Sequence, residues 1–240
     1  MAFHIMIVST CRPYFAPFPG FFTKIIQSDL AVLLDTVQFP RGTTWLTRNR
    51  WKSHQGMLWL TVPVSKKGLG LQRISDVKIC CDGQWCRKHL ESLKTAYRHA
   101  PYFDDHEAFC EEMFSRQFEK LIDLNRCVIT YLLKQLNIKT KVLLLSDLGI
   151  SAKEPRLTME ICRRVDGTAF LVGSSAGKYF ERDAFEKNGI ELMFFKPRIP
   201  VYPQLWGPFI PNLSVFDLIF NCGPKGAEMV TGGKVDGSYK

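Results

Sequence analysis

The sequence predicts an α/β fold: a mostly parallel β-sheet flanked by helices, with a helical insertion in the middle of the chain. The first observation is a β-α-β order at the start, where apolar segments at 4–9 and 30–35 flank a helical pattern at 20–28. The second is the return of this alternation after residue 141, with strands expected at 142–145, 168–172 and 190–195 and helices at 154–166 and 177–187. Strands that alternate with helices pair in parallel, because each helix crosses over one face of the sheet.

The segment between these two halves is predicted to be helical. Residues 84–99 and 104–137 carry apolar side chains at helical spacing, and Pro101 separates the two runs. Before this insertion, further strands are expected at 57–64 and 73–80, because both segments alternate and a turn-rich connection joins them.

Composition predicts one α/β domain over residues 1–240, with the helical insertion at about 84–137. The 240 residues, of which 46% are hydrophobic and 23% charged, exclude a disordered chain and a disulfide-stapled miniprotein. The eight cysteines follow no regular framework, so we expect reduced thiols in the cytoplasm. The longest uncharged stretch, 199–216, contains four prolines, so no membrane span is expected.

The formal net charge of +9 is concentrated in the first seventy residues, which hold eight Lys and Arg and two acidic residues. Aromatic residues are interleaved with these bases, a mixture suited to an anionic ligand with a planar ring. No zinc finger, RNP-type aromatic signature or long basic helix is present, which favours a phosphate-bearing small molecule over nucleic acid. The alternative is that these bases are solvated surface charges.

The densest polar cluster follows the strand expected at 30–35. In open α/β sheets ligands bind outside the carboxyl ends of the strands, so Asp35 is a candidate base and Gln38 a candidate hydroxyl partner. Arg48 and Asn49 are candidate anion or amide contacts, and Trp45 is a candidate substrate-stacking ring. The alternative is that Asp35 caps a turn and forms a structural salt bridge with Arg48.

A second candidate site lies between a predicted strand and a predicted helix in the C-terminal third. Its small residues allow backbone N–H groups to approach an anion, and its lysine adds a full positive charge. The candidate binding residues are Gly173, Ser174, Ser175, Gly177 and Lys178. The spacing is not that of a P-loop, and a strand-to-helix turn also favours glycine and serine for conformational reasons alone.

A histidine in the first helical run is a second candidate for acid–base chemistry. His89 is a candidate general acid or base and Tyr97 a candidate substrate contact, although a lone helical histidine is more often structural. Cys81 and Cys86 lie near His89, but no second ligand pair completes a closed zinc site, so no metal is predicted.

A proline- and aromatic-rich loop at 197–211 precedes a short helix expected at 214–221, which Ser214 is predicted to cap. Such loops shape pockets for sugar rings or planar groups, because proline and aromatic side chains are held in place at a small entropy cost. The candidate binding residues here are Tyr202, Gln204, Asp217 and Asn221. Packing against the sheet is the ordinary alternative.

Together these segments resemble the WbqC-like protein family of bacterial polysaccharide clusters over nearly the full length of the chain. The matching segments are Arg12 to Phe22, Gln27 to Asp29, Asp35 with Gln38 and Phe39, Trp45 with Arg48 to Arg50, Trp59 to Val64, Tyr97 to Phe103, Ser146 to Leu148, Gly173 to Tyr179, Tyr202 to Gln204, and Leu213 to Gly223. The chain departs from the family pattern at three positions. Arg12 stands where the family usually has glutamine, Phe18 where it has tryptophan, and Thr47 where it has asparagine.

The resemblance implies a cytoplasmic protein of O-antigen or related glycoconjugate synthesis, which transfers an acyl or aminoacyl group to a nucleotide-linked amino sugar. Its partner would be a small anionic substrate, either a nucleotide-sugar or an activated acyl donor. The sequence assigns no cofactor and no oligomeric state. The alternative is a non-catalytic binding or scaffold protein whose basic N-terminal third holds an anionic partner or nucleic acid.

Overall fold

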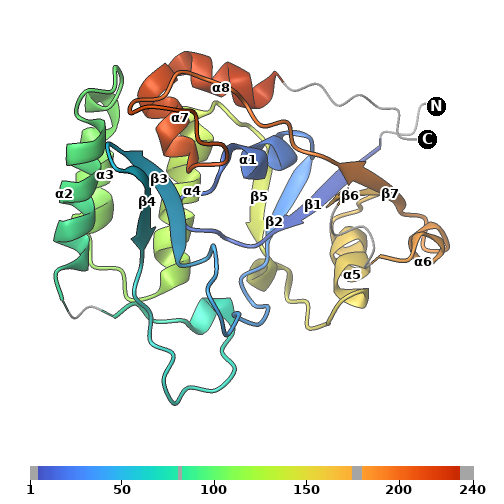
Figure 1. The fold of residues 1–240 in the computed structure, drawn as a ribbon. Helices are drawn as coiled ribbons and strands as arrows, with labels where there is room; N and C mark the ends of the chain where they lie inside the picture. Colours follow the sequence, from blue (N-terminus) through green and yellow to red (C-terminus); the bar gives the residue numbers. More distant parts are fainter. Residues whose placement is uncertain (1–4, 81–82, 175–179, 233–240) are drawn as a thin grey trace.

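A five-stranded parallel sheet forms the centre of the computed structural model, which describes residues 5–80, 83–174 and 180–232 (Figure 1). The strands of this sheet are β1 Ile7–Cys11, β2 Leu30–Leu33, β5 Lys141–Leu144, β6 Ala169–Gly173 and β7 Glu191–Phe195, and β3 Arg48–Ser53 and β4 Gly56–Thr61 form a separate antiparallel hairpin. The helices are α1 Pro19–Ile26, α2 Trp85–Tyr97, α3 Asp104–Ser115, α4 Leu121–Gln135, α5 Arg156–Arg164, α6 Arg182–Glu186, α7 Val215–Cys222 and α8 Pro224–Thr231, with 3₁₀ turns η1 Ile74–Asp76 and η2 Leu145–Leu148. The predicted α/β class and the helical middle segment are confirmed.

The strand order is β5-β2-β1-β6-β7, and all four pairings are parallel. Each residue of β2 is buried, as expected for a parallel strand covered on both faces. Alternate side chains enter two different cores. Ala31 and Leu33 pack with α1 and with the helical segment α2–α4, whereas Leu30 and Val32 pack with α5 and α6.

The strand order reverses beside β1, which has β2 on one side and β6 on the other. From β1 the chain passes to β2 through α1, and from β5 it passes through α5 to β6. Such a switch point leaves a crevice outside the carboxyl ends of the strands, because the two connections leave in opposite directions.

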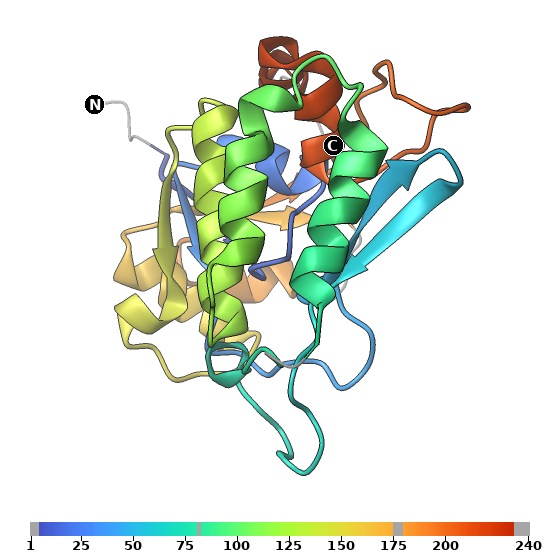
Figure 2. The ribbon, with the colours of Figure 1, turned by 90° about the vertical axis from the view of Figure 1, so that its left-hand side faces the viewer.

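The helical run predicted at 104–137 is two helices rather than one. The helix α3 ends at Ser115, and α4 begins at Leu121. The connection is extended at Arg116 and at Lys120, where the backbone pairs with Lys78. This break lets α4 turn back beside α3, as Figure 2 shows. The helix α4 thereby buries one apolar face.

The hairpin β3–β4 contains one strand that was predicted and one that was not. The strand β4 overlaps over most of its length with the segment predicted at 57–64, whereas β3 falls in residues for which no strand was predicted. Trp51 is the buried centre of this hairpin, and its ring stacks on Phe216 of α7 with centroids 5.3 Å apart. The hairpin is therefore attached to the C-terminal helices by aromatic packing.

Two other predicted elements need correction, and one helix was not predicted. The strand predicted at 73–80 is wrong: this segment forms η1, and only isolated bridges, such as the one between Val64 and Ile79, pair its ends. The helix predicted at 177–187 is shorter, because α6 covers only Arg182–Glu186 within the described residues. The helix α8 follows α7 directly and was not predicted, since Gly223 and Pro224 mark a break in the sequence pattern. Within the described ranges, no helix has the length and apolar character that a bilayer crossing requires.

Gly223 joins α7 to α8 and is a residue at which added bulk should be poorly tolerated. Its φ is +51°, and a Cβ there would lie 2.6 Å from the ring of Tyr102. We expect Gly223→Ala to lower the free energy of unfolding by about 1–3 kcal/mol, from backbone strain and overpacking. The measurement is urea denaturation followed by circular dichroism.

The matched control is Gly42→Ala, because a Cβ at Gly42 would meet nothing within 4 Å. This control should change stability by less than about 0.5 kcal/mol. Equal stabilities for the two variants would show that the Tyr102 ring moves aside at little cost.

Candidate functional site

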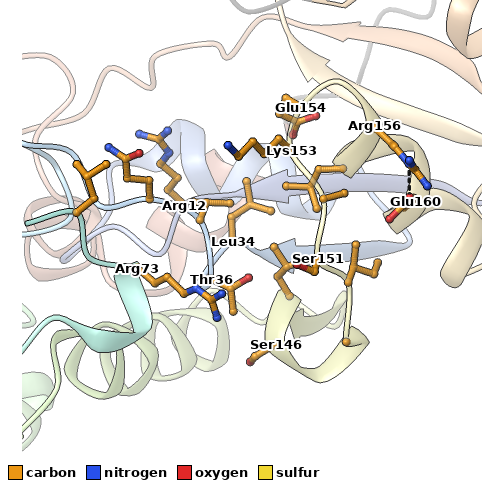
Figure 3. A pocket seen from close by; sticks show the side chains of 18 of the residues that line it. Arg12, Leu34, Thr36, Arg73, Ser146, Ser151, Lys153, Glu154, Arg156 and Glu160 are labelled. Carbon is orange, nitrogen blue, oxygen red and sulfur yellow. Dashed lines mark hydrogen bonds and ion pairs between the residues drawn. The ribbon is translucent and has the colours of Figure 1, made fainter.

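A cleft of about 1350 Å³ lies at the carboxyl edge of the sheet (Figure 3). Its walls come from four segments that are distant in the sequence. They are Arg12 after β1, Leu34 and residues 36–38 after β2, Leu71 to Arg73 before η1, and Leu145, Ser146 and most of residues 149–160, which run from η2 into α5. The cleft therefore lies where an open α/β sheet is expected to bind its ligand.

The cleft carries an excess of positive charge. Arg12, Arg73 and Lys153 line it, and none of them forms an ion pair with a described carboxylate. Of the two acids, Glu160 is occupied by Arg156, with Nε and Oε1 2.6 Å apart. Three cationic side chains and one remaining carboxylate therefore face the space shown in Figure 3.

The remaining carboxylate, Glu154, is held by the first turn of α5. It accepts hydrogen bonds from the Thr158 hydroxyl at 2.8 Å and from the Thr158 backbone N–H at 3.3 Å. Burial raises the pKa of Glu154, and these two hydrogen bonds oppose the rise. Glu154 is thus part of the wall, which leaves the three cations as the groups available to an anion.

Asp35 directly follows β2 between the lining residues Leu34 and Thr36, and its own side chain does not line the cleft. Its side chain is only 2% exposed, and its Oδ1 accepts a hydrogen bond from the Ser146 backbone N–H at 3.0 Å. Its backbone carbonyl accepts another from the Ser75 N–H at 2.8 Å. Asp35 therefore fixes the positions of η1 and η2 relative to β2, and its Oδ2 makes no hydrogen bond with any described residue.

Gln38 is the other predicted site residue that the structure brings to the cleft. It lines the cleft and forms a backbone bridge with Arg73. The alternative salt bridge between Asp35 and Arg48 is not formed, because Arg48 lies on the hairpin with its guanidinium 4.0 Å from the centroid of the Trp59 ring. These two predicted residues are brought together, and the other candidates that the structure describes lie elsewhere.

Trp45, Arg48 and Asn49 belong to the hairpin and its entry. The Trp45 and Trp59 rings lie 5.6 Å apart, and Arg50 covers Trp45 at 5.4 Å, so two arginines enclose two indoles. Asn49 faces the other way and is buried, where its amide donates to the carbonyls of Phe15 and Ala16 at 3.0 and 2.6 Å. Asn49 thus anchors the segment that follows β1.

The glycine- and serine-rich segment is described only in its first part. Gly173 ends β6, and the backbone N–H and hydroxyl of Ser174 both donate to the Phe195 carbonyl at 2.9 Å. These bonds join the ends of β6 and β7. The predicted residues Ser175, Gly177 and Lys178 lie outside the described residues.

Four of the predicted residues form a buried hydrogen-bond network around Asp217. Tyr97 donates to its Oδ1 at 2.7 Å and Tyr202 to its Oδ2 at 2.9 Å. Burial raises the pKa of Asp217, while the hydrogen bonds from the two tyrosines oppose the rise. Asn221 donates to the Asp217 backbone carbonyl at 2.7 Å. None of these residues lines the cleft.

Lys52 extends the same network toward the loop at 197–211. Its backbone N–H donates to the Tyr97 hydroxyl at 2.8 Å, and its ammonium group donates to Gln204 at 3.2 Å and to the Pro208 carbonyl at 2.7 Å. Burial lowers the pKa of Lys52, and the charge of Asp217 opposes that shift. The network therefore connects β3, α2 and α7 to the proline-rich loop.

His89 lies on α2 and is separated from the cleft. Its Nε2 lies 3.1 Å from the Thr61 backbone nitrogen and 2.9 Å from the Thr61 carbonyl oxygen, and its ring packs edge-on against Trp85 and Phe114. Burial lowers the pKa of His89. Among the residues that the structure describes, no group of three His, Cys, Asp or Glu side chains could hold a metal ion.

The three cleft cations were not among the predicted site residues. Arg12 could have been selected, because it directly follows β1 beside the strand-order reversal. Arg73 and Lys153 carry no local signal. They reach the cleft from connections whose paths depend on how η1 and α5 pack, and a single sequence does not show this.

The sequence match to known proteins covers the cleft and both cores. Residues 12–229 match the WbqC-like protein family. The chain belongs to this family. A relative of the chain is Rv1507c, an uncharacterized protein of Mycobacterium tuberculosis, which is 29% identical over 219 residues, covering 90% of this chain and 94% of the relative. In the comparison with solved structures, none matches this WbqC-like chain.

Removal of one hydroxyl tests whether the Asp217 network stabilises the fold. We expect Tyr202→Phe to lower the free energy of unfolding by about 1–3 kcal/mol, because it leaves a buried carboxylate oxygen without its donor. Urea denaturation at neutral pH measures this change.

The matched control is Tyr102→Phe, since the Tyr102 hydroxyl makes no hydrogen bond with any described residue. Its stability should stay within about 0.5 kcal/mol of the unmodified chain. A loss of the same size in both variants would show that the Tyr202 hydroxyl has no special role.

Proposed function

We propose that this WbqC-like protein is a transferase of bacterial surface-glycoconjugate synthesis that binds a phosphate-bearing small molecule in the cleft. The observation that carries the proposal is the convergence of Arg12, Arg73 and Lys153, without carboxylate partners among the described residues, at the carboxyl edge of a parallel sheet. Arginine binds phosphate with paired, charge-assisted hydrogen bonds, and lysine adds a point charge. A nucleotide-linked amino sugar has both the charge and the size that the cleft accommodates.

The proposed reaction is acyl or aminoacyl transfer to the amine of that sugar. The amine nitrogen forms a bond to the acyl carbonyl carbon, the bond from that carbon to its activating group breaks, and the amine loses a proton. The donor is an activated acyl compound, and its activating group leaves with the bonding electron pair. The family membership supports a shared fold and site, and the cleft chemistry supports the substrate class.

Asp35 is the proposed acceptor of the amine proton. It lies between two cleft-lining residues, and its Oδ2 is not engaged by any described residue, whereas Oδ1 is held by the Ser146 N–H. His89 is the less suitable candidate, because its ring nitrogen is already engaged by Thr61 away from the cleft.

The variant Asp35→Asn tests this assignment. It should retain ligand binding and lose turnover, and thermal melting of the free variant shows whether the side chain still holds η2 in place.

The proposed anion site is tested by Arg12→Gln and Arg73→Gln. Each change removes a charge-assisted contact, so affinity for a nucleotide-sugar or acyl donor should fall about 10-fold or more. The measurement is a thermal-shift titration with nucleotide-sugars, acyl-CoAs and aminoacyl donors, because a ligand that binds the folded state raises the melting temperature.

Arg126→Gln is the matched control, since Arg126 is an exposed arginine on α4 and does not line the cleft. It should leave the titration unchanged. If no ligand raises the melting temperature and the chain instead binds generic nucleic acid with steep salt dependence, the scaffold alternative replaces the transferase proposal.

A further inference from the structure

The connection at residues 65–73, between β4 and η1, carries two leucines that no core covers. Leu69 is 52% exposed and Leu71 is 59% exposed. Figures 1 and 2 both show this teal segment as a loop that projects from the body of the molecule at the end opposite α8. Two adjacent exposed leucines at a projecting tip have a hydration cost that burial against a partner would remove.

The loop holds this shape through its own contacts. The Gln72 side chain donates to the Ser65 carbonyl at 3.1 Å and closes the base of the loop. Gly68 and Gly70 have φ values of +78° and +61°, which side chains disfavour, and they alternate with the two leucines. This glycine alternation lets the chain turn tightly while both leucines stay at the surface.

The surroundings of the loop are strongly basic. No acidic residue occurs between Asp35 and Asp76, whereas this stretch contains seven Lys and Arg residues. Four of these are exposed on the loop or beside it: Arg41, Lys66, Lys67 and Arg73. Lys66 is held against the neighbouring loop, because its ammonium donates to the Gly42 carbonyl at 3.3 Å and lies 5.0 Å from the centroid of the Phe39 ring.

We propose that the loop at residues 65–73 docks onto an anionic lipid bilayer surface. Leu69 and Leu71 enter the boundary between the headgroups and the acyl chains, and Arg41, Lys66 and Lys67 contact lipid phosphates, while Arg73 remains at the wall of the cleft. Apolar side chains at the tip with a basic rim are the combination that binds peripheral proteins to anionic bilayers. Nucleic acid fits the loop less well, because exposed leucines gain nothing from phosphates and the loop has no aromatic ring to stack on a base.

This docking places the cleft next to the bilayer. Leu71, Gln72 and Arg73 belong both to the loop and to the wall of the cleft. A substrate anchored in the bilayer with an anionic headgroup could therefore reach Arg12 and Arg73 without leaving the surface. The docking itself does not depend on the proposed transfer reaction, since it uses side chains outside the base of the cleft.

The test is sedimentation of the full chain with vesicles of phosphatidylcholine containing phosphatidylglycerol, and with phosphatidylcholine vesicles alone. We expect binding to the anionic vesicles only. Leu69→Ser combined with Leu71→Ser should lower the partition coefficient at least 10-fold. Lys67→Gln combined with Arg41→Gln should lower it by roughly five-fold for each base removed, because each exposed base adds attraction to the anionic surface.

The matched control is Val201→Ser, because Val201 is 77% exposed but lies on the loop at 197–211, at the opposite end of the molecule. Its partition coefficient should equal that of the unmodified chain. Circular dichroism of every variant shows that the fold is kept. Sedimentation with the same vesicles in the presence of a single-stranded oligonucleotide competitor distinguishes lipid binding from general polyanion binding.

Two results would overturn the proposal. One is a chain that does not sediment with anionic vesicles at physiological salt. The other is a double leucine variant that sediments as the unmodified chain does, or that loses binding no more than Val201→Ser. In that case only the attraction of the bases to phosphates accounts for the binding. Equal binding of the oligonucleotide by the unmodified chain and by the double leucine variant would then assign the basic loop to nucleic acid instead.

Discussion

Parallel pairing of the five central strands requires every connection to cross back over the sheet, because a tight turn cannot join two parallel neighbours. All five strands therefore end at the same edge. The residues that follow β1, β2 and β5 meet there, although those after β5 lie more than a hundred positions along the chain from those after β1 and β2. The cleft and the basic loop both depend on this arrangement, since the hydrogen bonds of Asp35 join η1 and η2 to the end of β2.

A second constraint acts away from the cleft, where a carboxylate is buried. Asp217 loses its hydration inside the protein, and the hydroxyls of Tyr97 and Tyr202 supply the missing hydrogen bonds. The partners come from α2 and from the proline-rich loop, so satisfying one charge fixes the relative positions of three segments. Tyr97, Tyr202 and Asp217 therefore have a structural role in the fold, and their role in substrate binding stays a prediction.

Apolar runs predicted the sheet well. The segments at β2, β5 and β6 are short and apolar, and helical patterns lie between them. The α/β class and the order of these elements along the chain therefore followed from the sequence. The strand β3 was not predicted because its sequence, Arg-Asn-Arg-Trp-Lys-Ser, is mostly polar. Its inward positions include Asn49, whose buried amide donates to the carbonyls of Phe15 and Ala16. Amide-to-backbone bonds of this kind leave no periodic apolar signal.

The site was predicted less well than the fold, for a related reason. Asp35 and Gln38 follow a recognisable strand, so their place at the edge could be inferred. The positions of Tyr97 and Tyr202 could not, because 120 residues separate Tyr97 from Asp217 and only packing brings them together. A single sequence shows which residues are polar, but not whether a polar residue faces a ligand or a buried partner.

The four-segment origin of the cleft has a consequence for folding. Its walls lie at residue 12, residues 34–38, residues 71–73 and residues 145–160, so every pair of opposing walls is joined by a long loop of chain. Closing such loops costs conformational entropy and slows folding, so the walls meet only when the central strands have paired. A partly folded chain has no binding site, and a ligand of the cleft would therefore act as a probe of complete folding rather than of any one part.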